Sequence, residues 1–295
     1  MNVSAARSLT ESAILKKPAF KPTFALSQRI FLTLVLALSN VFSYSQSYKK
    51  TNRTKIYAEE SGDSIIIRAD NDMVIPVTLR LLFEVENPVP HSVDTVLSIV
   101  DPKTTGKILK VLYPENPNGR YKYNYSWRVV PGDVTQSVNA DYFYRFPYDK
   151  NAGYKVSQGP FGSFSHQKMY AYDFLMPVGT AVCAARDGIV AAIKNDSDKG
   201  GSDRKFINEA NYISIYHDDG TMANYCHLGK KGIKVKEGQK IKQGQVIALS
   251  GNTGFSNGPH LHFEVIKPNI NTDLKQWVKF RWESATSRPD LVLNY

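Results

Sequence analysis

Residues 258–265 read GPHLHFEV, in which apolar and ionisable side chains alternate after a Gly-Pro pair. In a β-strand, every second side chain points to the same face of the sheet. The Leu, Phe and Val of this stretch would then form one apolar face, and His260, His262 and Glu264 would share the opposite face. Two imidazoles placed in this way can converge on one metal ion, or one can bind the ion while the other acts on a substrate. Alone, the pattern is weak, because exposed polar residues often occupy such positions.

Other candidate ligands lie upstream of this stretch. The chain has six His, and five of them lie in its second half. A strand over residues 222–228 would carry His227, and a second strand, over residues 170–174, follows His166 and contains Asp173. An unpaired carboxylate within an apolar strand is costly. Asp173 is therefore expected either to bind a metal or hydrogen-bonded partner, or to form a structural salt bridge.

Taken together, one carboxylate and several His on strands of a Gly-rich β-domain suit a catalytic zinc site. Such a site uses three nitrogen or oxygen ligands from the protein and leaves one position for water. Zinc lowers the pKa of that water and polarises a carbonyl group. Unligated imidazoles nearby can accept the proton and stabilise the intermediate. The sequence therefore predicts one Zn²⁺ per chain.

The remaining patterns predict an all-β protein. Residues 77–85 alternate apolar and polar side chains, which is typical of a half-buried strand, and Pro- and Asn-containing turns separate further strands. We expect an N-terminal antiparallel β-sandwich-like domain over residues 46–150. Over residues 151–295, frequent Gly and short strands predict a Gly-rich antiparallel β-barrel or sheet.

Four aromatic residues of the first domain alternate along one further strand: Tyr121, Tyr123, Tyr125 and Trp127. Such a stripe can form a platform on which sugars stack. It can also be the buried face of a sheet, which is the commoner reason for this pattern. We therefore expect these aromatic side chains to belong to the core of the first domain.

Residues 1–45 have the order of a secretory signal. Basic residues precede an apolar run at 30–38, and the small residues Ser43 and Ser45 follow it. The apolar run is short for a bilayer span, so we expect no stable membrane span after signal cleavage; an uncleaved anchor is the alternative. The prediction is an exported protein that acts in the periplasm or cell envelope, or outside the cell.

The charge of the chain also bears on its partners. The formal net charge is +10, and a basic exported protein is attracted to an anionic polymer such as a cell wall. Nucleic acid is the other common partner of basic proteins. The export signal and the absence of a basic run argue against it.

Several motifs between about residues 159 and 265 resemble the lysostaphin/LytM-type zinc endopeptidases. The matching stretches are YDF at 172–174, PVGT at 177–180, AARDG at 184–188, HDDG at 217–220, YCHL at 225–228, SGNTG at 250–254 and GPHLHFE at 258–264. Several motifs in order over a hundred residues are far more specific than any one of them. The resemblance implies a duplicated hybrid motif fold and hydrolysis of peptide bonds in bacterial peptidoglycan.

The resemblance also implies a set of functional residues: His166, Asp173 and His262 as zinc ligands, with His227 and His260 as the catalytic pair. His260 would act as the base, and His227 would orient water or stabilise the oxyanion. The family's usual first motif has His and Asp four residues apart, but Met169 occupies that position here. His166, seven residues before Asp173, is the candidate left. Longer spacings that begin with Ser-His resemble a branch of the family that carries an upstream β-domain.

The other residues of these types have simpler expected roles. His217 matches a family position outside the zinc ligands and is expected to be structural, and His91 is expected at the surface. Glu264 is a candidate to orient an imidazole from outside the ligand set. Cys183 and Cys226 can form one bridge or remain two buried thiols.

Three alternative functions follow from the same sequence. The first is a non-catalytic family member that binds and regulates another cell-wall hydrolase; such proteins lose ligands or catalytic His, whereas this chain keeps a candidate at all five positions. The second is a carrier or phosphotransfer domain, which has similar Gly turns but needs a modifiable Lys at a hairpin tip that has no signature here. The third is a secreted peptidase that acts on proteins.

Overall fold

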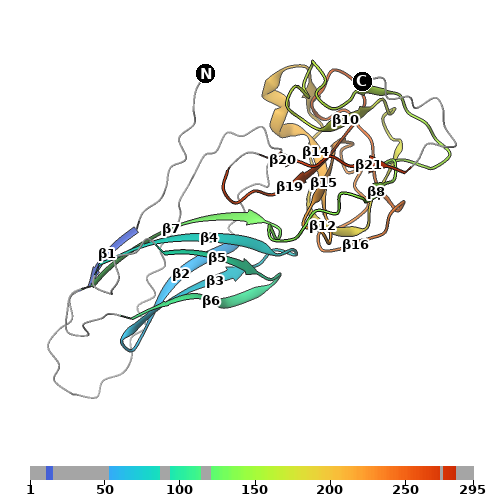
Figure 1. Ribbon diagram of the computed structural model, residues 1–295. Helices are drawn as coiled ribbons and strands as arrows, with labels where there is room; N and C mark the ends of the chain where they lie inside the picture. Colours follow the sequence, from blue (N-terminus) through green and yellow to red (C-terminus); the bar gives the residue numbers. More distant parts are fainter. Residues whose placement is uncertain (1–10, 16–52, 87–93, 114–120, 273–274, 284–295) are drawn as a thin grey trace, which may run out of the picture. The chain divides into compact units, whose positions relative to one another are not determined.

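The computed structural model describes residues 11–15, 53–86, 94–113, 121–272 and 275–283. It divides into two compact units: of the described residues, those up to Val130 belong to the first and those from Pro131 onward to the second. The regular secondary structure of the described residues is almost entirely β-strand, with one 3₁₀ helix, η1 (Arg204–Glu209). The predicted all-β class is confirmed (Figure 1).

The first unit contains two sheets. Their strands are β2 (Thr54–Ser61), β3 (Ser64–Asn71) and β6 (Thr104–Leu112) in one sheet, and β1 (Glu11–Leu15), β7 (Tyr121–Pro131), β4 (Val77–Glu86) and β5 (Asp94–Val100) in the other, in that spatial order. β3 pairs antiparallel with both of its neighbours, and β4 pairs antiparallel with β5. Alternate residues of β3 and β4 are buried, among them Ile67, Leu79 and Leu81. Over the described part of the alternating stretch, from Val77 to Phe83, the expected apolar face of β4 is buried.

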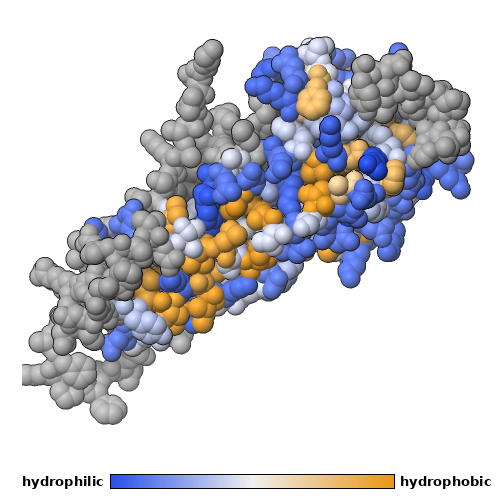
Figure 2. Space-filling view, in the orientation of Figure 1, coloured by the Kyte–Doolittle hydropathy of each residue, from blue (hydrophilic) through white to orange (hydrophobic). Residues whose placement is uncertain are grey.

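The aromatic stripe on β7 is only partly buried. Tyr125 is 6% exposed and its ring centre lies 6.2 Å from that of Phe83 on β4, whereas Trp127 is 38% exposed. Other apolar residues also reach the surface of this unit (Figure 2), including Leu97 of β5 and Ile108 of β6. The first unit thus has a conventional apolar core and, in addition, apolar positions on its outer faces.

The second unit is built around one open antiparallel sheet. In spatial order its strands are β16 (Lys240–Ile241), β12 (Gly188–Lys194), β14 (Asn211–Tyr216), β15 (Met222–Leu228), β19 (Leu261–Lys267), β10 (Ala171–Phe174) and β9 (Val156–Gln158), and β20 (Gln276–Trp277) also pairs with β19. Every residue of β10 and β15 is buried. These strands therefore lie in the middle of the unit, where functional side chains can be held rigidly.

Three two-stranded sheets complete the second unit. They are β11 (Ala181–Cys183) with β17 (Val246–Leu249), β13 (Gly200–Gly201) with β18 (Gly254–Phe255), and β8 (Phe143–Tyr144) with β21 (Arg281–Trp282). The first pair is antiparallel and the other two are parallel. β18 and the chain that follows it lead directly into β19, so these short strands shape the approach to the GPHLHFEV stretch.

Residues 131–150 pack with the second unit. The rings of Tyr144 and Tyr148 are buried in its core, where Tyr148 contacts Phe174 of β10 and Tyr144 contacts Phe263 of β19. The two units therefore divide after Val130, whereas the sequence placed the boundary near residue 150. Aromatic side chains from this segment bury large apolar areas only where the large sheet provides a surface for them.

The structure bears only in part on the expectations for residues 1–45, His91 and the two Cys. Residues 1–45 lie outside the described part except for β1, which pairs antiparallel with β7. His91 also lies outside it. No helix within the described ranges has the length and apolarity needed to cross a bilayer. Cys183 and Cys226 are both free and buried.

Candidate functional site

Two candidate ligands face each other on neighbouring strands. β10 and β19 pair antiparallel, and their register places Asp173 directly opposite His262. Leu261, Phe263 and Val265 are fully buried on one face of β19, so the period-two pattern does direct His262 to the opposite face. Directly opposed side chains on one sheet face have Cβ atoms about 5 Å apart, which brings the carboxylate of Asp173 within reach of the imidazole of His262.

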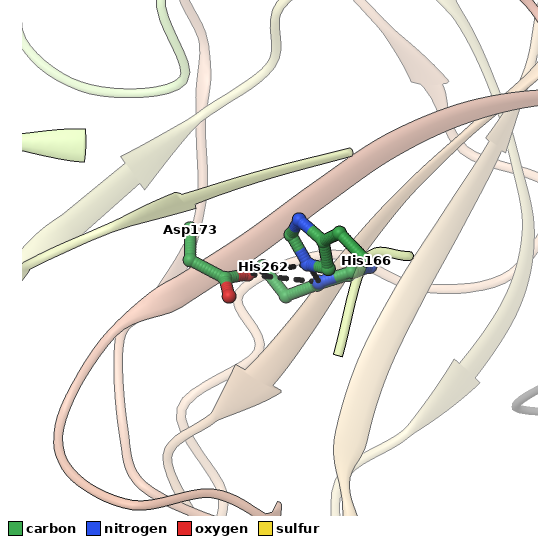
Figure 3. Close-up of side chains that lie close together, drawn as sticks. All are labelled: His166, Asp173 and His262. Atoms are coloured by element: carbon green, nitrogen blue, oxygen red, sulfur yellow. Dashed lines mark hydrogen bonds and ion pairs between the residues drawn. The ribbon is translucent and has the colours of Figure 1, made fainter. Parts of the chain in front are cut away.

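His166 reaches the same point from the loop that precedes β10. Its Nε2 lies 3.3 Å from Oδ1 of Asp173 and 3.2 Å from Nδ1 of His262, and the Nδ1 of His262 lies 2.9 Å from the same Oδ1 (Figure 3). Figure 3 shows the three side chains pointing toward one another. Ligands of a tetrahedral zinc ion, at about 2.0–2.1 Å from the metal, lie roughly 3.3 Å from each other. The spacing of these three atoms therefore fits one such ion.

The loop explains why His166, and not a residue at position 169, meets Asp173. The backbone N–H of Met169 donates to the carbonyl of His166, and the N–H of Phe161 donates to the carbonyl of Met169. The backbone of Met169 is thus used within the loop. The Nδ1–H of His166 donates to the carbonyl of Gly159 at 3.0 Å. Because a carbonyl can only accept, this bond leaves the lone pair on Nε2, the atom that faces Asp173 and His262.

Asp173 is buried, His262 is largely buried, and each shifts the pKa of the other. Burial by itself would raise the pKa of the Asp173 carboxyl, but the neighbouring imidazoles of His166 and His262 bring that pKa well below its usual range. Burial lowers the pKa of His262, but the carboxylates of Asp173 and Glu264 outweigh it and raise that pKa to about 9.

His227 and His260 form a second pair beside the first group. Their ring centres lie 4.5 Å apart, and that of His227 lies 6.0 Å from that of His262. His260 Nε2 is 3.8 Å from Oδ1 of Asp173. The structure therefore brings all five sequence-predicted residues into one cluster.

Both rings of this pair are oriented by backbone carbonyls. Nδ1–H of His227 donates to the carbonyl of Thr253 at 2.7 Å, and Nδ1–H of His260 donates to that of Gly258 at 2.8 Å. Each ring in its neutral form consequently carries its lone pair on Nε2. Burial, and then the neighbouring His260 and His262, lower the pKa of His227 to about 3, so His227 is neutral at physiological pH. Its φ of 63° is unusual for a residue other than Gly, and such strained positions are concentrated at functional sites.

Glu264 lies beneath His262, but its bonds go elsewhere. It accepts hydrogen bonds from Asn224 at 2.9 Å, from Trp277 Nε1 at 2.7 Å, and from Lys275 Nζ. Its Oε2 is 3.9 Å from Nε2 of His262, which is longer than a hydrogen bond. The carboxylate thus chiefly joins β19 to β15 and β20.

His217 is separate from this cluster. It is fully buried, its Nδ1 donates to the carbonyl of Asp187 at 2.6 Å, and its ring packs edge-on against Tyr144. Burial, together with the charge of Arg186, lowers its pKa to about 4. His217 is therefore a neutral core residue.

One polar residue at the site was not singled out from the sequence. Gln158 ends β9, and its amide nitrogen donates to Oδ2 of Asp173 at 3.0 Å. No pattern marked it, because a single Gln at the end of an edge strand is usually a solvated surface residue. Only the pairing of β9 with β10 makes it a neighbour of the carboxylate.

Comparison with known proteins identifies the second unit. Residues 167–274 match Peptidase family M23; Asp173, His227, His260 and His262 lie inside this match, and His166 immediately precedes it. Peptidoglycan DD-endopeptidase ShyA of Vibrio cholerae is 46% identical over 94 residues, which are 32% of this chain and 19% of that protein. Glycyl-glycine endopeptidase ALE-1 of Staphylococcus capitis is 34% identical over 131 residues, 44% of this chain and 32% of that protein.

A solved structure is also similar to a part of the chain. The antimicrobial peptidase lysostaphin from Staphylococcus simulans has 32% identity and a TM-score of 0.33, and the alignment covers 42% of this chain and 47% of that protein. The chain thus spans only about a fifth to a third of the length of the curated relatives ShyA and ALE-1. Within that span, the ordered motifs and the family match agree, and the chain therefore contains a domain of peptidase family M23 in its second compact unit.

Proposed function

We propose that the second unit is a zinc-dependent endopeptidase that hydrolyses peptide bonds in peptidoglycan stem or cross-link peptides. The observation that carries this proposal is the convergence of His166 Nε2, Asp173 Oδ1 and His262 Nδ1, which all lie within 4.8 Å of one another. Two nitrogen donors and one oxygen donor are the ligand set of a catalytic zinc site with an open fourth position.

The surroundings of these three residues favour a metal over a purely structural network. The hydrogen bond from His166 to Gly159 and the bonds that Asp173 accepts hold the donor atoms in place without using the lone pair of His166 Nε2. Such outer partners are the rule at metal sites. Bound zinc would lower the pKa of a water molecule and polarise the carbonyl of a peptide.

Both rings of the catalytic pair are the same tautomer, with Nδ1–H on a backbone carbonyl and the lone pair on Nε2. The base is assigned to His260 because the resemblance to the family implies that role and its Nε2 can accept a proton from the attacking water. His227 has its only N–H bonded to Thr253 and also offers a lone pair. Of the two roles expected for His227, orienting water by accepting its hydrogen bond is therefore favoured over donating to an oxyanion.

Peptidoglycan is the substrate that the relatives and the charge support. ShyA is named as a peptidoglycan endopeptidase, and the chain is basic, with a net charge of +10. A basic protein is drawn to the anionic polymers of a cell wall. We accordingly place its action in the cell envelope or outside the cell.

The test is mass spectrometry of soluble products released from purified peptidoglycan by the purified protein. Zinc-replete protein, chelated protein and zinc-replete His260→Ala run in parallel. New peptide ends that appear only with the zinc-replete wild type are expected, and they also identify the bond that is cut. Wild-type protein that binds zinc and releases nothing would contradict the proposal. Protein that neither binds zinc nor cleaves would favour a regulator of another cell-wall hydrolase.

A further inference from the structure

The amide of Gln158 joins the two parts of the metal-ligand group that come from different segments. Its oxygen Oε1 accepts from the backbone N–H groups of Phe164 at 3.0 Å and Ser165 at 2.9 Å, with that of His166 at 3.4 Å. Its nitrogen Nε2 donates to Oγ of Ser165 at 2.8 Å and to Oδ2 of Asp173 at 3.0 Å. One side chain thus binds both the loop that carries His166 and the carboxylate of Asp173.

This arrangement matters because of the long spacing between the two ligands. His166 lies seven residues before Asp173 and outside β10, so the strand itself does not determine its position. The backbone N–H groups beside His166 point inward to Gln158 and not to another strand. Pairing between strands fixes the positions of Asp173 and His262. In place of such pairing, the Gln158 amide fixes the position of the His166 loop.

The loop also makes room for this side chain. A Cβ atom at Gly162 would lie 2.3 Å from Cγ of Gln158 and 3.0 Å from its Oε1. Any side chain at position 162 would consequently push the Gln158 amide from its place. Gly162 is not among the residues with positive φ, so its requirement for Gly arises from the close approach of Gln158 and not from backbone conformation.

We propose that Gln158 is a positioning residue for the metal site, which holds the His166 loop and the Asp173 carboxylate in their ligand geometry. The hydrogen bond from Gln158 to Oδ2 leaves Oδ1 of Asp173 facing His166 and His262. The inference rests on the proposed zinc site and adds to it a residue outside the ligand set. Loss of such outer partners lowers metal affinity by about 10–100-fold.

The test measures zinc affinity by competition with a chromophoric chelator, together with the visible spectrum of the Co²⁺-substituted protein and the melting temperature of the metal-free protein. Gln158→Met keeps the length of the side chain and removes every hydrogen bond. Gly162→Ala leaves all hydrogen-bonding groups in place and displaces Gln158. The matched control is Gln245→Met, because Gln245 accepts from the backbone N–H of Lys242 at a turn outside the site.

We expect Gln158→Met and Gly162→Ala each to weaken zinc binding by about 10–100-fold and to alter the Co²⁺ spectrum, whereas Gln245→Met does neither. The variant that combines Gln158→Met with Gly162→Ala should lose little more zinc affinity than Gln158→Met alone, because both substitutions remove the same set of hydrogen bonds. If Gln158→Met does not fold, Gly162→Ala decides. If either folded variant binds zinc as tightly as the wild type, the positioning role of Gln158 is wrong and the proposed function still stands. If the wild-type protein does not bind zinc, both the positioning role and the proposed function are wrong.

Discussion

Asp173 and His262 are separated by 89 positions in the chain, yet Oδ1 of the first lies 2.9 Å from Nδ1 of the second. The contact follows from the register of β10 and β19, which pairs these two residues directly. Because the side-chain period of a strand is two, a slip of one residue would turn the imidazole of His262 into the core. Burial of the apolar residues on either side of His262 stabilises the register of β19 with β10, and that register keeps His262 opposite Asp173.

Replacing Asp173 by Asn should remove most zinc binding. The amide oxygen is neutral, so it attracts the cation less than the carboxylate does, and the amide nitrogen cannot ligate. We expect zinc affinity to fall by more than the roughly 10–100-fold typical of outer partners, as measured by chelator competition. Asp187→Asn is the control, because Asp187 is paired with Lys242 and Gln243 outside the site. Equal losses in both variants would show that charge alone, and not ligation, is responsible.

Substitution of either member of the catalytic pair should strongly slow turnover without removing zinc. His260→Ala and His227→Ala each remove an imidazole lone pair from the site, and loss of general acid–base assistance costs about 10²–10⁴-fold in rate. Zinc content by elemental analysis should remain one per chain, and the release of peptide ends from peptidoglycan gives the rate. Retention of more than a tenth of the activity by His260→Ala would exclude it as the base.

Glu264→Gln should affect stability more than metal binding. Glu264 is 1% exposed and holds Lys275, whose side chain is 10% exposed. Removing one partner of a buried ion pair costs about 3–5 kcal/mol, and we expect a loss near the lower limit because Gln still accepts from Trp277. Zinc affinity should change little, since Glu264 makes no hydrogen bond to His262.

The control for this prediction is a double variant. Lys275→Met removes the charge that Glu264→Gln leaves unpaired, so the pair of substitutions should destabilise less than the sum of the two single ones. Urea denaturation of all four proteins measures the free energies of unfolding. A large loss of zinc affinity in Glu264→Gln would instead support an orienting role for this carboxylate.

His217 should make the protein less stable in mild acid. Its pKa is about 4 in the folded protein and about 6.5 in an unfolded chain. Protonation therefore favours unfolding: the stability that depends on neutral His217 is fully present above about pH 6.5 and is lost as the pH falls toward 4. Between pH 7 and pH 5 the loss is about 2 kcal/mol.

Comparison with His217→Gln isolates this effect. Other groups titrate equally in both proteins, so the difference between their free energies of unfolding should change by about 2 kcal/mol over this pH range. Denaturant titrations at several pH values supply these energies. A difference that does not vary with pH would show that His217 is not the group responsible.

Much of the site follows from local patterns. The alternation in residues 258–265 predicted that His262 lies on the face of β19 opposite to Leu261 and Phe263, because the period of a strand is a local property of the backbone. The clustering of His and the ordered motifs then indicated which strands meet. All-β architecture and the burial of alternate residues from Val77 to Phe83 rest on the same kind of pattern.

Only the tertiary structure decided how separate segments combine. The path of the loop before β10, the hydrogen bonds that orient His166, His227 and His260, and the place of Gln158 depend on contacts between residues far apart in sequence. The same holds for residues 131–150, whose aromatic rings join the second unit, and for Glu264, which turned out to bond Lys275 and Trp277. Residue types and strand period determine what a side chain can do and which way it points, whereas register and loop path determine which other side chain it meets.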